Sequence, residues 1–464
     1  MITIKTWQDL QALGDNEKDR MDFVRTVIAE HKGSKLYRQA VTAKQYYRGL
    51  NVTIMNYCKF VRDAYGKAIP DVWSPNHKIP CHYYKYLINQ AALTLLGNGV
   101  SFAKKDTKEK LGSLFDETLI EIFIDALNDS VGYGFVDKDK VTHFNALEFA
   151  ALQDEETSAI RAGVRFWQID ADKPLRATLY EEDGFTEYIQ RKGKDMEILA
   201  EKRPYVIVVQ KSDISETEIV DGWNYPTFPI VPLYNVEKMS ELEGSRELHD
   251  AMDLMLSGLV NNVDSGEIIY WLLKNSNGMD QPSMNQLLQT LHSAHIASID
   301  NEDDLTAHSP QVHFEASKEA LDQLRRQIFD NHMGFDPKSI VSGAVTATQI
   351  EAAYEPLNQK CSLLESKVAK FIVGVLAVLD IDDKPTFNPD FIINRQESVN
   401  TIVAAGDNLP QTYKTRKILE ILGDIDKTDE VLAEMDAAES VRFTTENEDE
   451  EPEGAEPAAK TLEV

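Results

Sequence analysis

The chain has 464 residues, of which 42% are hydrophobic and 9% aromatic, so it can bury one large core or several smaller ones. Its formal net charge of −29 disfavours tight nonspecific binding to nucleic acid or anionic lipid unless basic groups are concentrated locally. The three cysteines, and an N-terminus without a basic region followed by an apolar core, suggest neither a disulfide framework nor a secretion signal, and we expect a reducing compartment. The longest apolar run, residues 371–379, is about half the roughly 20 residues that a membrane span needs.

The first part of the chain is predicted to be helical. Residues 16–70 show helical periodicity with polar interruptions, and further helices are predicted within residues 76–102 and over 111–130. The helix within residues 76–102 has one apolar face and is expected to stop at a left-handed turn formed by the glycines of residues 97–99. That face carries Tyr83, Leu87, Ala91 and Leu95.

Alternating sequences then predict a meandering antiparallel sheet up to about residue 223. Six strands are expected, in the stretches 164–170, 176–183, 185–193, 196–202, 205–210 and 217–223. Gly132-Tyr133-Gly134 lies before a strand instead of a helix, so it is a poor phosphate loop, and we interpret it as a tight turn. Residues 228–235 are expected to be extended because two prolines deny them a helix.

The second half is predicted to be mainly helical. A helix is expected from Ser240, where Ser240 and Glu243 have the spacing of a capping box, and a second helix over 315–334. About 50 residues between them predict a small separate unit of strands and one helix. The apolar faces of the two helices carry Leu248, Met252, Met255, Leu259 and Val263, and Leu321, Leu324 and Ile328.

A long helix is predicted over residues 350–379 with a kink at Pro356, followed by short helices over 397–440. The segment 446–464 has eight acidic residues and one lysine, and it is expected to be disordered. Its net charge of −7 leaves −22 on the rest of the chain, so the folded body is acidic too.

Catalytic and metal-binding patterns are weak. The chain has no GxxxxGK[ST], HExxH, GxSxG or CxxC motif, which argues against an ATP-driven motor and common hydrolases. Three acidic or histidine-rich groups could be offered as metal ligands, although packing or solvated turns explain each more simply. They are His77, Cys81 and His82; His292 and His295 with Asp300, Glu302, Asp303 and Asp304; and Asp380, Asp382 and Asp383. No metal or cofactor is expected.

The order of these parts resembles the portal protein, or head-to-tail connector, of tailed bacteriophages. The resemblance covers roughly residues 40–440 and rests on order and texture: a helix ending LLGNGVSF, a strand-rich middle, FPIVPLYN, two helices around a small insert, RRQIFDNHMG, DPKSIVSGAVTA and a long kinked helix. It implies an α+β fold with a wing, a two-helix stem, a small α/β clip, a tunnel loop with a long kinked helix, and a helical crown. The implied ranges are wing 1–239, stem helix 240–264, clip 265–314, second stem helix 315–334, tunnel loop 335–346, kinked helix and wing return 347–396, crown 397–442 and acidic tail 443–464.

The resemblance also implies the function. Such a chain is a structural protein without enzymatic activity, forming a dodecameric ring at a unique capsid vertex through which double-stranded DNA is packaged and ejected. The implied partners are the terminase large subunit, the major capsid and scaffolding proteins and a head-tail adaptor protein, with no membrane. The implied location is the virion, with assembly in the host cytoplasm. An acidic channel wall suits this role because neutralised phosphates would hold passing DNA.

The expected DNA-facing residues lie in the implied tunnel loop: Lys338, Ser339, Ile340, Val341, Ser342, Gly343, Ala344, Val345 and Thr346. Arg325 and Arg326 are candidate basic contacts on the second stem helix. Alternatively, Lys338 is a solvated lysine, the loop is an ordinary connector, and the arginines pair with Asp322 or Asp330 at helical spacing. Stem packing is assigned to Leu248, Met252, Met255, Leu259, Leu321, Leu324 and Ile328.

Two other function classes stay open at this point. One is a metal-dependent nucleic-acid hydrolase that uses the residues around His292 and Asp303. The other is a nonviral scaffold that recruits basic partners through its acidic tail.

Overall fold

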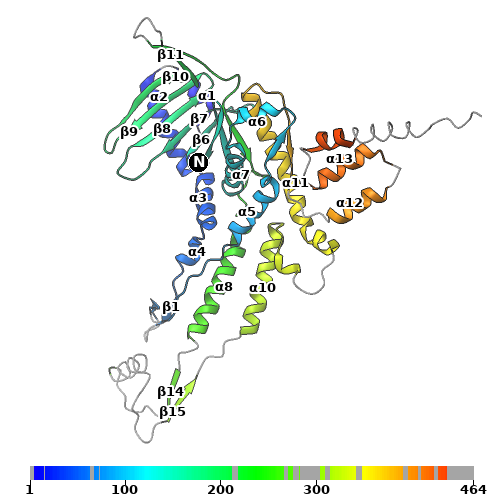
Figure 1. Cartoon of the computed structure of the whole chain (residues 1–464). Coiled ribbons are helices and arrows are strands. Elements are labelled where there is room, and N and C mark those ends of the chain that lie inside the picture. Colours follow the sequence, from blue (N-terminus) through cyan, green and yellow to red (C-terminus); the bar gives the residue numbers. More distant parts are fainter. Residues whose placement is uncertain are drawn as a thin grey trace, which may run out of the picture. The chain divides into compact units, whose positions relative to one another are not determined.

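The computed structural model describes residues 5–14, 16–62, 67–72, 74–211, 218–265, 270–274, 282, 304–308, 314–340, 347–389, 395–405, 409–422 and 427–435. The chain divides into two compact units, residues 1–339 with 355–390, and residues 340–354 with 391–464. The fold mixes helices and sheets, as the sequence predicts (Figure 1). Within the described residues, no helix combines the length and the hydropathy that crossing a membrane requires.

The first unit opens with a run of helices, of which the first two contact a five-stranded sheet. These helices are α1 (Trp7–Gln11), α2 (Glu17–Gly33), α3 (Lys35–Tyr47) and α4 (Val52–Met55). Phe23, Val24, Val27 and Ile28 of α2 pack against the sheet in one buried cluster. The helical prediction is wrong at the end of this stretch, because β1 (Phe60–Arg62) pairs with β2 (Ala68–Pro70), where Pro70 and β-branched residues disfavour helix.

The strands follow the predicted meander. The sheet has the order β10-β9-β8-β7-β6, every pair is antiparallel, and neighbours in the sheet are neighbours in the chain. A separate hairpin pairs β11 with β12. All six predicted strands are confirmed. The sequence could predict them because alternating side chains and short turns are local signals. The bounds are β6 Phe149–Gln153, β7 Ile160–Trp167, β8 Leu175–Glu181, β9 Gly184–Gln190, β10 Met196–Arg203, β11 Val206–Lys211 and β12 Glu218–Trp223.

A three-stranded sheet, β13-β4-β5, forms a second layer: β4 is Val131–Asp137, β5 Lys140–Asn145 and β13 Ile230–Tyr234. The tight turn predicted at Gly132-Tyr133-Gly134 is wrong, since these residues lie inside β4. Their glycines permit close packing instead. A Cβ at Gly132 would lie 2.3 Å from the Ile122 carbonyl oxygen, and one at Gly134 would lie 2.6 Å from Cζ of Phe371.

The predicted helix in residues 76–102 is shorter than expected. Helix α5 spans Tyr83–Leu96, because Pro75 and Pro80 keep the preceding residues extended. Leu87, Ala91 and Leu95 are buried as predicted. The left-handed residue after the helix is Gly99, with φ of +71°, while Gly97 keeps a right-handed conformation. Further elements are β3 (Val100–Phe102), α6 (Lys105–Leu111) and α7 (Phe115–Asp129).

Two helices lie side by side beyond the sheets, α8 (Arg246–Ser265) and α10 (Phe314–Asn331) (Figure 1). The predicted start at Ser240 is wrong. The Ser240 hydroxyl accepts the Leu242 N–H, Gly244 has φ of +86°, and the first helical bond runs from His249 N–H to the Ser245 carbonyl. Between the helices, β14 (Tyr270–Lys274) pairs with β15 (Asp304–His308). The helix predicted near 284–295 lies outside the described residues.

Helix α11 spans Ala347–Val378 and continues through Pro356. In the first unit, its buried residues include Leu364, Val368, Phe371 and Val375, and β16 (Pro385–Phe387) pairs with β3. In the second unit, α12 (Arg395–Ala404) packs against α13 (Gln411–Leu422), and residues 428–435 are helical, as the predicted short helices require. The predicted tail lies outside the described residues.

Candidate functional site

The region where α8, α10, α5 and α11 meet holds most of the candidate site residues that the structure describes. Its apolar part is a cluster in which Leu87 of α5, Met252 of α8, and Ile328 and Phe329 of α10 are buried. Leu248, Leu321 and Leu324 are half-buried against it. Met255 and Leu259 are also half-buried but lie outside this cluster, and Val263 is exposed. Phe329 is a packing residue that the sequence reasoning missed.

The opposite stripe of α8 is polar and buried. His249, Asp253, Ser257 and Asn261 follow one another at intervals of four residues, and each is at most 4% exposed. The last three meet an extended segment, residues 75–81, which we call the strap. Because residues i and i+2 of an extended chain are spaced like residues i and i+4 of a helix, the two can bond in register.

Every second residue of the strap, at positions 77, 79 and 81, bonds to α8 in this way. The Asp253 carboxylate accepts the Cys81 N–H at 2.7 Å, the Ser257 hydroxyl accepts the Ile79 N–H at 3.0 Å, and the Asn261 side-chain oxygen accepts the His77 N–H at 2.6 Å. Side chains of α8 therefore satisfy the backbone N–H groups of His77, Ile79 and Cys81, in place of a second strand.

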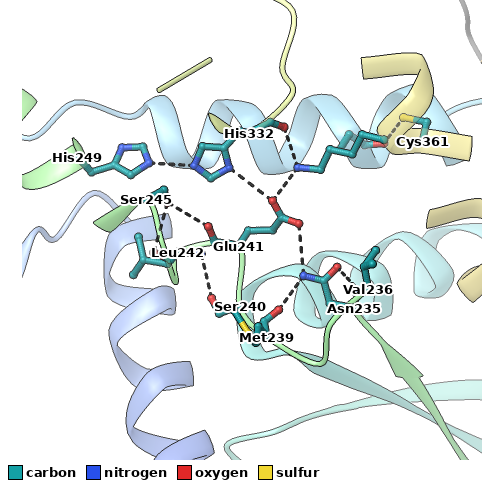
Figure 2. A network of polar contacts seen from close by, with 12 residues as sticks. Asn235, Val236, Met239, Ser240, Glu241, Leu242, Ser245, His249, His332 and Cys361 are labelled. Carbon is teal, nitrogen blue, oxygen red and sulfur yellow. Dashed lines mark hydrogen bonds and ion pairs between the residues drawn. The ribbon is translucent and has the colours of Figure 1, made fainter. Parts of the chain in front are cut away.

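A second set of polar groups, the polar hub, consists of the buried His249, His332 and Lys360 and the partly buried Glu241 (Figure 2). Lys360 of α11 donates to the Glu241 carboxylate at 2.7 Å and to the His332 carbonyl at 3.1 Å. The other Glu241 oxygen accepts from the Asn235 amide at 3.3 Å. His249 and His332 face each other, with their Nε2 atoms 3.2 Å apart. The polar hub thus joins α8, the end of α10 and α11.

Burial and charge set the protonation of the hub. Burial alone would raise the pKa of Glu241, but Lys360 and His332 more than offset it and hold that pKa at about 2. Burial lowers the pKa of His332, and it lowers the pKa of His249 to about 3, with His332 adding to the effect on His249. Both imidazoles are therefore neutral at pH 7. One Nε2 donates to the other.

The chain leaves α10 through a sharp corner. Met333 has φ of +51°, and a Cβ at Gly334 would lie 2.2 Å from Cδ2 of Leu87. The Gln90 side chain then brackets Phe335, accepting its N–H at 2.9 Å and donating to its carbonyl at 3.0 Å. This corner leads into a short 3₁₀ helix, η1 (Pro337–Ile340).

The basic candidate residues have different surroundings. Arg325 is 8% exposed, pairs with Asp336 and stacks near the rings of Tyr83 and Phe329. Its predicted partners, Asp322 or Asp330, are wrong, because Asp336 holds the guanidinium. Arg326 and Lys338 are exposed, while Ser339 donates to the Asp336 carbonyl at 2.6 Å. Ile340 ends η1, and residues 341–346 lie outside the described residues.

The weaker candidates occupy separate places. His77 Nε2 lies 2.9 Å from Asp264, the Cys81 amide bonds to Asp253, and the His82 ring lies against Gly49. Asp383 accepts from the Thr107 hydroxyl at 2.7 Å and from the Lys104 N–H at 3.1 Å, near the start of α6. In the part of the chain that is described, no group of three or more His, Cys, Asp or Glu could hold a metal ion. His292, His295 and the acidic residues 300–303 lie outside that part.

Comparison with known proteins decides the family. The family model described as phage portal protein, SPP1 Gp6-like, matches residues 28–442. The chain belongs to this family. The portal protein of Bacillus phage SPP1 is 23% identical over 350 residues, covering 71% of this chain and 68% of that protein. The portal protein of Clostridium phage phiCD119 is 25% identical over 156 residues, covering 32% of this chain and 34% of that protein.

Solved structures give a fainter likeness. A chain from the virion of a native gene transfer agent particle is 12% identical, with a TM-score of 0.41, over 72% of this chain and 89% of that one. A chain from the neck of the native particle, computed with C12 symmetry, is 12% identical, with a TM-score of 0.40, over 72% of this chain and 87% of that one.

Proposed function

We propose that this portal-family chain assembles into a dodecameric ring at one vertex of a phage capsid, where double-stranded DNA enters during packaging and leaves during ejection. The observation that carries the proposal is the family match over residues 28–442. The charge supports it, since a subunit with a net charge of −29 binds phosphates weakly overall and so does not hold passing DNA tightly. The role is structural, and no catalytic activity is proposed.

We propose the following regions for the subunit. The wing comprises residues 1–239 with the return after α11, the stem is α8 with α10, and the clip is the insert between them, around β14 and β15. The tunnel loop extends from Phe335 to Thr346, followed by α11, and the crown contains α12 and α13. The bounds of the stem helices differ from the predicted ones because α8 begins at Arg246 and α10 ends at Asn331.

Two exposed cations are the proposed DNA contacts. Lys338 stands on η1 at the start of the loop, and Arg326 stands on α10; both are exposed. Repeated around a ring, each becomes a circle of weak phosphate contacts. The remaining loop residues proposed to face DNA are Ser339 to Thr346. Arg325 is left out because Asp336 holds it.

The proposed partners follow from this position in the virion. The clip meets the terminase large subunit during packaging and the head-tail adaptor afterwards, while the wing meets major capsid and scaffolding proteins during assembly in the host cytoplasm. Negative-stain electron microscopy of the purified protein tests the central claim. Class averages should show rings with a hole wide enough for duplex DNA. Monomers or dimers under capsid-assembly conditions, with scaffolding protein present, would contradict it.

A further inference from the structure

The chain makes one excursion out of the first compact unit, leaving after Ser339 and returning at Glu355. This excursion includes the proposed tunnel loop and the first turns of α11. On both sides of it, side chains from distant elements bond to the backbone or to buried charges. These contacts show how the ends of the excursion are held.

On the exit side, Gln90 of α5 holds Phe335. The side-chain oxygen of Gln90 accepts a hydrogen bond from the Phe335 N–H, and its amide nitrogen donates one to the Phe335 carbonyl, although the two residues are 245 positions apart in sequence. Phe335 is 7% exposed, and Gly334 fits against Leu87 with no room for a Cβ. A paired bond of this kind fixes the backbone of one residue, as pairing with a neighbouring strand does.

A second contact follows one residue later. Asp336 pairs with the buried Arg325 of α10, and the same carboxylate oxygen accepts the Lys338 N–H at 2.9 Å. Asp336 therefore connects the first turn of η1 to α10. Arg325 also lies near the rings of Tyr83 and Phe329, so its guanidinium has aromatic contacts besides the ion pair.

On the return side, Lys360 provides the anchor. Its ammonium group bonds to the Glu241 carboxylate and to the carbonyl of His332, the residue just before the exit corner. This contact closes the excursion at its base. Pro356 lies between the return point and this anchor and lacks the N–H that would bond to the carbonyl of residue 352, so α11 has one helical hydrogen bond fewer there.

We propose that Gln90, Arg325 and Lys360 are positioning residues that fix both ends of the excursion, on the exit side at Phe335 and Asp336 and on the return side in α11. Gln90 sets the direction in which the loop leaves α10. This inference rests on the proposed function to the extent that the loop borders the DNA channel. The anchors themselves are contacts within one chain.

Hydrogen exchange measured by mass spectrometry tests the exit anchor. In Gln90→Ala, peptides covering residues 333–340 should exchange roughly tenfold faster, because the backbone of the buried Phe335 loses both of its hydrogen bonds to Gln90. Gln90→Glu keeps the acceptor for the Phe335 N–H and loses the donor, so its increase should be smaller. Gln327→Ala, an exposed glutamine of α10, is the matched control and should not change these peptides. Unchanged exchange in Gln90→Ala, with the wild-type fold retained, overturns the proposal.

Packaging measurements separate the anchor from the ring. We expect Gln90→Ala rings to form as the wild type does, and the DNA packaged per particle to fall severalfold, with Gln90→Glu partly restoring it. Rings that assemble normally and package normally despite faster exchange overturn the positioning role while leaving the proposed function intact. A wild-type protein that forms no rings contradicts the proposed function instead.

Discussion

Lys360 neutralises Glu241 where neither side chain has much access to water, since their side chains are 10% and 17% exposed. In Lys360→Met, the carboxylate would stay buried without its cation. We expect the free energy of unfolding to fall by about 3–5 kcal/mol, the range for breaking one side of a buried pair. Urea unfolding of the purified protein measures this change.

Two further variants test whether a loss of stability in Lys360→Met comes from the unpaired Glu241 carboxylate. Lys370→Met, an exposed lysine on the same helix, should change stability by no more than about 0.5 kcal/mol. Combining Lys360→Met with Glu241→Leu removes both charges and should recover most of the loss. A Lys360→Met protein as stable as the wild type would show that the ion pair is not what holds these helices.

The paired histidines make a prediction about acid. His249 and His332 are neutral in the folded protein because burial lowers their pKa values, that of His249 to about 3, whereas unfolding returns them to ordinary values near 6.5. The groups facing them are Tyr84 of α5, Glu241 before α8, and Lys360 of α11. Between pH 6.5 and pH 3, the unfolded state binds more protons, so stability should fall as the pH falls.

His249→Gln isolates this effect, since glutamine keeps a polar side chain that does not titrate. We expect the wild type to lose stability faster than the variant between pH 6.5 and pH 4.5, by up to about 1.4 kcal/mol per pH unit. Urea unfolding at several pH values measures both slopes. Parallel slopes would mean that His249 is protonated, or exposed to water, in the folded protein.

At the scale of elements, the strap depends on α8 for its backbone partners. Ser257→Ala removes the acceptor of the Ile79 N–H, and we expect a loss of about 1 kcal/mol and a looser strap. The reactivity of the Cys81 thiol reports how tightly the strap is held. Burial, together with the Asp253 charge, raises the pKa of this thiol to about 12 and so suppresses the reactive thiolate. In a Cys58→Ser background, which removes an exposed thiol, Ser257→Ala should speed the reaction of Cys81 with a disulfide reagent severalfold.

Ser362→Ala changes an exposed serine of α11 and should leave the Cys81 rate unchanged. The Cys361 thiol is buried and contributes little in either protein. If Ser257→Ala leaves the Cys81 rate at its wild-type value, the hydrogen bonds to α8 do not hold the strap, and its apolar contacts do.

These elements also show what the sequence could predict. The strands β7 to β12 were predicted because alternation and turns are local. The strap was not, since its partners lie more than 170 residues away. Two signals were available: Pro75 and Pro80 forbid a helix, and Asp253, Ser257 and Asn261 form a polar stripe opposite the apolar one. The Arg325 partner was missed for a related reason, because Asp336 lies beyond helical spacing, past the end of α10.

For the whole molecule, sequence order was enough to recognise the portal family, and the match over residues 28–442 confirms it. The polar hub could not be predicted in the same way. Glu241, His249, His332 and Lys360 come from separate segments, and none stands in a motif. Only the packing of α8, α10 and α11 brings them together, whereas the family resemblance concerns the order of the parts.

Net charge gives the last prediction, which concerns ring assembly. Each subunit carries −29, so subunits repel one another over a distance set by salt, about 30 Å at 0.01 M and about 8 Å at 0.15 M ionic strength. We expect the fraction of protein in rings, measured by sedimentation velocity at fixed concentration, to rise with sodium chloride over this range. Truncation after Phe443 removes a net −7 and should weaken the salt dependence. Rings that dissociate as salt rises would show that ion pairs between subunits outweigh their repulsion.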